Sequence, residues 1–254
     1  MRTFAILLLA IAAAFGAARA PAQEKQETKE APRYRDLRRI GAVHGDAAAA
    51  TEKAQVCSGC HGANGIAIAP VFPNLAGQSA EFLYWRLVVY KLGTVPESAM
   101  TPMVATLEDA DLRNLATYFA HNGASAAGAS APAAPAAPQD SGDAARIARG
   151  ERLFFGGDAA RGVPPCQGCH GADARGWRPA KGAGPRALAF YRTWPALRGQ
   201  NAPYLVGKLQ QYRAAQWGAS SNGFIMQGVA ARMDDESIEA IAAWLASLAP
   251  QAPS

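Results

Sequence analysis

Apolar residues recur at three- and four-residue intervals along much of the chain, which is the spacing of one face of an α-helix. Helices are predicted on this basis over residues 46–56, 79–92, 143–155 and 202–215. Two further helices are predicted to begin in the acidic stretches 108–111 and 234–236, because carboxylates stabilise the positive end of a helix dipole. Few stretches have the composition of a strand, so the predicted fold class is all-α.

The same series of sequence features occurs twice. A Cys-x-x-Cys-His-Gly motif at 57–62 is followed by Pro-x-Leu-x-Gly-Gln at 73–78, and second copies stand at 166–171 and 195–200. In each half, a predicted helix, a methionine and a terminal helix follow in the same order. Shared order and spacing indicate a duplicated domain.

The segment 124–140 separates the two copies. It is rich in alanine and proline, a composition that forms no core and acts as a semi-rigid spacer. The sequence therefore predicts one domain over 44–123 and a second over 141–254. Because the spacer is long, we expect a loosely fixed relation between them.

The N-terminal 22 residues have the features of an export signal. Arg2 precedes an uncharged apolar run over 3–18, and small residues follow. The run is shorter than the roughly 20 residues that span a bilayer, so we expect cleavage and a periplasmic location. A retained signal is the alternative, and it would give peripheral association with a membrane. The charged segment 23–43 is predicted to be a loose arm.

The Cys-x-x-Cys-His motifs carry the candidate chemistry. A Cys-x-x-Cys pair alone fits a redox dithiol, half a zinc site or a haem anchor, and the histidine directly after it favours haem c. Thioether bonds to two haem c groups would use all four cysteines, so no disulfide is expected; these are Cys57, Cys60, Cys166 and Cys169. The proximal iron ligands are predicted to be His61 and His170.

Methionine is the expected ligand on the other face of each iron, since a soft thioether favours Fe(II) and suits a reversible carrier. Met100 and Met226 stand at matching places in the two halves, each seven residues before an apolar position that precedes the terminal helix. They are the predicted distal ligands. Met103 and Met233 align with apolar residues of the other half, so both are expected in the core.

Three further residues are candidates for a role at the haems. His44 and His121 have no counterparts in the other half, so we expect exposed or locally bonded side chains rather than iron ligands. The carbonyl of Pro70 could hold the imidazole N–H of His61, and turn formation explains this proline equally well.

The formal net charge is +5, and the excess of lysine and arginine falls in the second half. The segment between His170 and Pro195 is about twice as long as that between His61 and Pro73, and it is basic. Its basic loop includes Arg175, Trp177, Arg178, Lys181, Arg186 and Arg192. We expect this loop to dock an acidic partner, with a solvated loop as the alternative. Nucleic acid is not an expected partner, because the chain is exported and its basic residues are not interleaved with aromatics.

With these motifs in place, the chain resembles tandem class I cytochromes c, most closely the dihaem cytochrome c4 family. The resemblance implies two small all-α lobes, His/Met ligation in each, and electron transfer in the periplasm between a quinol-oxidising complex and a terminal oxidase. It implies a carrier rather than an enzyme. The alternatives are an electron-accepting subunit of a periplasmic dehydrogenase complex and a haem enzyme such as a dihaem peroxidase, which would need an open iron.

Overall fold

The structure, a computed structural model, describes residues 35–37, 40–126, 141–176 and 191–249. These residues belong to one compact unit, Pro32–Ser254. Within the described residues the regular structure is helical, and extended pairing is limited to isolated bridges. The predicted all-α class is confirmed.

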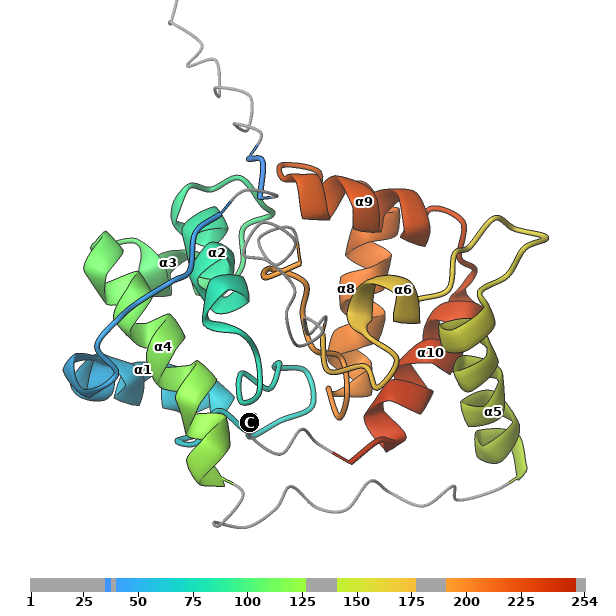
Figure 1. Ribbon diagram of the computed structural model, residues 1–254, viewed down its shortest axis with the longest axis horizontal. Coiled ribbons are helices and arrows are strands. Elements are labelled where there is room, and N and C mark those ends of the chain that lie inside the picture. The colour runs from blue at the N-terminus through green and yellow to red at the C-terminus, as the bar shows by residue number, and fades with distance from the viewer. Residues whose placement is uncertain (1–34, 38–39, 127–140, 177–190, 250–254) are drawn as a thin grey trace, which may run out of the picture. The chain divides into compact units, whose positions relative to one another are not determined.

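The helices fall into two lobes (Figure 1). The first lobe, residues 40–126, contains the 3₁₀ helix η1 (Ala48–Ala50), α1 (Thr51–His61), α2 (Ala80–Lys91), α3 (Met100–Val104) and α4 (Asp109–Ala126). The second lobe, the described residues from 141 to 249, contains α5 (Ser141–Gly156), α6 (Gln167–His170), α8 (Ala202–Arg213), α9 (Ser221–Ala230) and α10 (Asp235–Ser247). The helices predicted over 79–92, 143–155 and 202–215 are confirmed. The helix predicted over 46–56 continues through the haem motif to His61, and the short helices α3 and α9 were not predicted.

The core of the first lobe lies where α2 packs against α4. Leu83 of α2 is buried against Leu112, Leu115 and Phe119 of α4. Ser79 caps the N-terminus of α2, because its side chain accepts a hydrogen bond from the Phe82 amide at 3.1 Å. These contacts fix the position of α2 and of the loop that leads into it.

The core of the second lobe is built around the crossing of α5 and α10. Phe154 of α5 is fully buried, and its ring centroid lies 4.6 Å from that of Trp244 in α10. Gly150 is the residue that lets the two backbones approach, since a Cβ built there would lie 2.0 Å from the Ala240 carbonyl oxygen.

Part of the charged N-terminal arm binds the second lobe, so the prediction of a loose arm is wrong for residues 35–37. Arg35 donates its amide to the Ala219 carbonyl at 2.8 Å and accepts from the Ser221 amide at 2.9 Å. Leu37 is buried, and its amide donates to the Ser221 hydroxyl at 2.9 Å. Residues 35–37 therefore bind the second lobe directly before α9. Composition could not reveal this, because the arm finds its partners far away in the chain.

The expectation of loosely related lobes is also wrong for the described residues, since side chains of each lobe are buried against the other. Gln78 of the first lobe donates to the Ala196 carbonyl at 2.7 Å, and Ser79 donates to the Arg192 carbonyl at 2.8 Å. Helix α4 extends to Ala126 and α5 begins at Ser141. The remainder of the predicted spacer, and the predicted signal over residues 1–22, lie outside the described residues.

Candidate haem sites

Each Cys-x-x-Cys-His motif lies on a helix that ends at its histidine. Cys57 and Cys60 are three residues apart on α1, so both thiols lie on one side of the helix, and His61 is its last residue. In the second lobe Cys166 is the N-cap of α6, and Cys169 follows within the helix. This geometry lets both thiols of a lobe meet one edge of a planar group.

The glycine after each histidine is required by the backbone. Gly62 has φ 71° and ψ 154°, and Gly171 has φ 79° and ψ 150°, a region that is essentially restricted to glycine. A Cβ at Gly62 would lie 1.9 Å from the Ile66 carbonyl oxygen. The chain can therefore leave the motif helix at this angle only with glycine, which explains the repeated Cys-His-Gly ending.

Three of the four thiols have raised pKa values, unlike the reactive cysteine of a redox dithiol. All four cysteines are free of disulfide bonds. Burial raises the pKa of Cys57 and of Cys169, and it raises the pKa of Cys166 to about 11. Dithiol oxidoreductases instead lower the pKa of a cysteine to expose a thiolate. Among the described residues no cluster of three or more histidine, cysteine or acidic side chains could hold a metal ion.

Hydrogen bonds fix the protonation of both motif histidines. Nδ1 of His61 lies 2.9 Å from the Pro73 carbonyl oxygen, and Nδ1 of His170 lies 3.0 Å from the Pro195 carbonyl oxygen. A carbonyl can only accept, so Nδ1 must carry the proton in each ring. Both histidines are buried, and desolvation lowers their pKa values, which favours the neutral ring. Nε2 of each imidazole therefore has no proton and keeps the free electron pair with which a histidine binds iron.

The carbonyl that bonds Nδ1 of His61 is that of Pro73 and not that of Pro70, so of the two interpretations of Pro70 the histidine contact is wrong. Pro73 and Pro195 open the two Pro-x-Leu-x-Gly-Gln segments, and each bonds the histidine of its own lobe.

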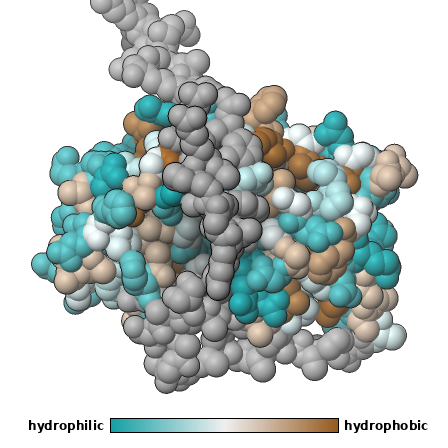
Figure 2. Space-filling model, viewed as in Figure 1, coloured by the Kyte–Doolittle hydropathy of each residue, from teal (hydrophilic) through white to brown (hydrophobic). Residues whose placement is uncertain are grey.

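The structure separates the four candidate methionines by exposure. Met100 begins α3 and Met226 lies in α9, and both side chains are half-buried. Met233 is 5% exposed and packs in the second core, as predicted. Met103 is 51% exposed, so its prediction as a core residue is wrong: α3 is a single short helix with one buried position, Val104. Figure 2 shows apolar residues over α9, where Phe224 is 66% exposed.

A cationic and aromatic cluster, consisting of Arg86, Tyr90, Tyr204, Lys208 and Trp217, joins α2 to α8. The Arg86 guanidinium carbon lies 3.9 Å from the Trp217 ring centroid, and Lys208 Nζ lies 3.8 Å from it. Burial, together with the charge of Arg86, lowers the pKa of Lys208 to about 6. Sequence reasoning missed this cluster, because its two cations come from opposite halves of the chain.

The cluster provides a test of whether the site suits haem. Nη2 of Arg86 is buried and has no hydrogen-bond partner, and within the described part of the chain no carboxylate forms an ion pair with Arg86 or Lys208. Nε1 of Trp85 is also buried without a partner. Orphaned donors of this kind are costly unless an acceptor completes them. They fit a prosthetic group that carries carboxylates, as haem does in its propionates.

The remaining predicted residues have other contacts. His44 is exposed, and Nδ1 of His121 lies 2.8 Å from the Thr117 carbonyl of its own helix. In the basic loop, residues 177–190 lie outside the described residues. Arg192 turns toward the first lobe, where Nη1 lies 3.4 Å from a Glu81 carboxylate oxygen, and Arg175 lies near Asp173. Arg192 is therefore occupied within the molecule rather than directed at a partner.

Comparison with known families divides the chain as its repeat does. The family described as "Cytochrome c" matches residues 147–249, and the family described as "Cytochrome C oxidase, cbb3-type, subunit III" matches residues 46–119. Together with the two attachment motifs, these matches define a c-type cytochrome with two covalently bound haem c groups.

Three similar proteins indicate which family of c-type cytochromes the chain belongs to. Cytochrome c4 of Pseudomonas aeruginosa is 35% identical over 204 residues, which cover 80% of this chain and 89% of that protein. The crystal structure of reduced recombinant cytochrome c4 from Pseudomonas stutzeri superimposes with a TM-score of 0.62 at 32% identity, covering 81% of this chain and 100% of the other. The thiosulfate dehydrogenase electron acceptor of Thiomonas intermedia is 33% identical over 79% of this chain and 82% of its own length. The chain belongs to the cytochrome c4 family, and it is a dihaem electron carrier.

None of the described helices has the length and the apolar composition needed to cross a membrane.

Proposed function

We propose that this protein is a periplasmic electron carrier with His61 and Met100 as axial ligands in the first lobe and His170 and Met226 in the second. In this proposal residues 1–22 are a removed export signal, and the two domains span 44–123 and 141–254. The protein converts no substrate itself. The observation that carries the proposal is the tautomer of the two motif histidines, whose Nδ1 atoms bond the Pro73 and Pro195 carbonyls.

When bound, each haem iron takes up and releases one electron. The chain's own residues hold the site still while this happens. The two proline carbonyls fix the plane of each imidazole and keep the proton on Nδ1. Burial of His61 and His170 excludes water from the imidazole rings, and the thioethers of Met100 and Met226 would favour the reduced state of the group they hold. With a histidine and a methionine both as ligands, the iron would have no open position for peroxide, which is why we propose a carrier rather than a peroxidase.

Optical and magnetic circular dichroism spectra of the oxidised holoprotein test the ligands. We expect the weak charge-transfer band of iron–methionine sulfur bonding, with Met100→Ala and Met226→Ala each removing about half of it. Met103→Leu and Met233→Leu are the matched controls and should keep the full band. Loss of the band in Met103→Leu, with the band intact in Met100→Ala, would overturn the assignment in the first lobe.

The partners we propose are redox proteins: a quinol-oxidising complex or a dehydrogenase as donor, and a terminal oxidase as acceptor. A dehydrogenase donor is supported by the similarity to the thiosulfate dehydrogenase electron acceptor of Thiomonas intermedia. Stopped-flow reduction by a purified thiosulfate dehydrogenase and by a quinol-oxidising complex distinguishes the two donors. Peroxide turnover by the isolated holoprotein would contradict the carrier proposal altogether.

A further inference from the structure

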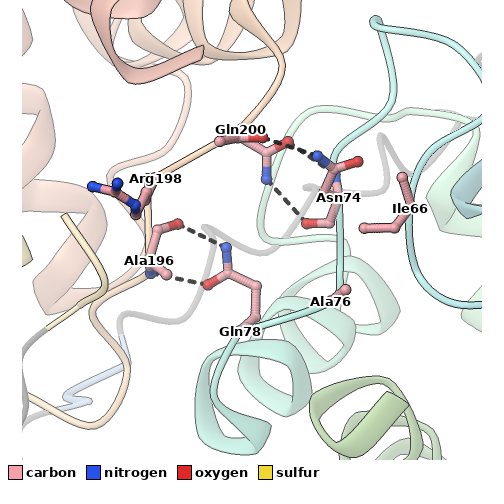
Figure 3. A pocket seen from close by; sticks show the side chains of 8 residues that line it. Ile66, Asn74, Ala76, Gln78, Ala196, Arg198 and Gln200 are labelled. Atoms are coloured by element: carbon pink, nitrogen blue, oxygen red, sulfur yellow. Dashed lines mark hydrogen bonds between the residues drawn. The ribbon is translucent and has the colours of Figure 1, made fainter. Parts of the chain in front are cut away.

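Two buried glutamines reach across the boundary between the lobes in a reciprocal arrangement (Figure 3). Gln200 of the second lobe inserts its amide against the backbone of Asn74 in the first. Its Oε1 accepts from the Asn74 amide at 2.8 Å, and its Nε2 donates to the Asn74 carbonyl at 3.0 Å. The side-chain amide thus forms a closed pair with one residue of the opposite lobe.

Gln78 of the first lobe makes the mirror arrangement with Ala196 of the second. Its Oε1 accepts from the Ala196 amide at 3.0 Å, and its Nε2 donates to the Ala196 carbonyl at 2.7 Å. Gln78 is 7% exposed and Gln200 is 5% exposed. The backbone partners fix which end of each amide is oxygen, because a backbone N–H only donates and a carbonyl only accepts.

The residues that the glutamines hold directly follow the prolines that orient the histidines. The N–H of Asn74 and the C=O of Pro73 belong to one peptide group, and that C=O accepts the proton of His61 Nδ1. An unbroken series of hydrogen bonds therefore runs from Gln200 through this peptide to His61. The equivalent series runs from Gln78 through the Pro195–Ala196 peptide to His170.

Hydrogen bonds in series strengthen one another. An acceptor on the N–H of a peptide group polarises its carbonyl, and the hydrogen bond to that carbonyl is strengthened by roughly 10–30%. A stronger carbonyl acceptor draws the Nδ1 proton and makes the imidazole a better electron donor at Nε2. Better donation stabilises the oxidised iron and lowers its reduction potential.

We propose that Gln78 and Gln200 are positioning residues, each of which sets the reduction potential of the haem in the opposite lobe through the proximal histidine. This inference rests on the proposed ligation by His61 and His170. Its consequence is that each haem depends on the presence and the exact seating of the other lobe. Movement of the lobes, for example on docking a redox partner, would change both potentials.

The test is a redox titration of the holoprotein followed by NMR, in which haem methyl resonances report each lobe separately. Gln200→Met keeps the side-chain volume and removes the amide. We expect the equilibrium constant for reduction of the first-lobe haem to rise about threefold, which is an increase in potential of about 28 mV for one electron. The potential of the second-lobe haem should stay unchanged. Gln78→Met should give the crossed result, and it should raise only the second-lobe haem.

Asn201→Ala is the matched control at the same boundary. The Asn201 side chain donates to the Phe72 carbonyl at 2.8 Å, so its loss removes a bond between the lobes without touching the Pro73–Asn74 peptide. We expect neither potential to change. Gln200→Asn, which keeps a polar group but is too short to reach Asn74, should repeat the shift of Gln200→Met and guards against a variant that loses its fold.

The proposal is overturned if a glutamine variant shifts both haems equally, shifts the haem of its own lobe, or shifts neither. Failure of the proposed function would look different. It would appear in the wild-type protein as the absence of the iron–methionine band, whereas failure of the glutamine proposal leaves that band intact in every variant.

Discussion

Substitution of Gly150 tests how the second lobe is held together. Gly150 lies in α5 at its crossing with α10, where a Cβ would come within 2.0 Å of the Ala240 carbonyl oxygen and 2.7 Å of Trp244 Cβ. The nearest atoms belong to backbone, which cannot rotate away. Gly150→Ala therefore requires α5 and α10 to separate by roughly 1.5 Å, since non-bonded heavy atoms need about 3.5 Å.

The expected cost follows from two opposing terms. Forcing a methyl group into a closed helix crossing costs about 3 kcal/mol, the upper end for overpacking, because both sides of the contact are rigid. Alanine is a better helix former than glycine by about 1 kcal/mol. The difference is a net loss of about 2 kcal/mol, which lowers the melting temperature of a lobe of this size by about 8 °C or more.

Thermal unfolding of the oxidised holoprotein, followed by tryptophan fluorescence and by the Soret band, measures this loss. Gly207→Ala in α8 is the matched control, because nothing lies within 4 Å of a Cβ at this helical position. We expect the control to be unchanged or slightly stabilised. A Gly150→Ala variant as stable as Gly207→Ala would refute the idea that this crossing limits stability.

Three further substitutions test the other structural claims. Asp234→Ala removes the cap of α10 and should cost about 1 kcal/mol at pH 7. Hydrogen bonds from Ser237 and Arg161 lower the pKa of Asp234, so the stability that this carboxylate contributes is present above about pH 4 and is lost as the pH falls further. Urea unfolding at pH 7 and at pH 3 would detect this loss. Leu37→Ala should cost about 2 kcal/mol and speed hydrogen exchange of the Ser221 amide, whereas the more exposed Leu92→Ala should not. Gly171→Ala forces a side chain into a glycine-only conformation and should lower the haem content of the second lobe alone, as a pyridine haemochrome assay of the separated haem peptides would show.

The elements that sequence could predict are those whose signal is local. The helix predicted over 202–215 is observed as Ala202–Arg213, because its apolar spacing reports a buried face directly. Helix α3 has five residues, including Pro102, and α9 contains two glycines, so neither has a strong intrinsic preference for helix. Contacts with the rest of each lobe decide these two elements.

The haem motifs were the most predictable part of the site, and the arrangement around them was the least. The motif spacing alone identifies Cys57, Cys60 and His61, since attachment chemistry needs these residue types in sequence. The repeat marks Pro73 as equivalent to Pro195, but the sequence does not say whether the carbonyl of Pro70 or that of Pro73 contacts His61. Only the folded loop shows which carbonyl reaches Nδ1.

The pairing of the lobes shows why the length of the spacer predicted their relation so poorly. Lengthening a flexible connection costs little, about 0.6 kcal/mol for each doubling, so a spacer neither fixes nor prevents docking. What fixes the lobes is that Gln78 and Gln200 are buried and would lose their partners on separation. Because each bonds the segment that orients the other lobe's histidine, the contact that joins the lobes is the same contact that reaches both haem ligands. The relation between the two haems is therefore set by these paired segments and not by the chain that connects them.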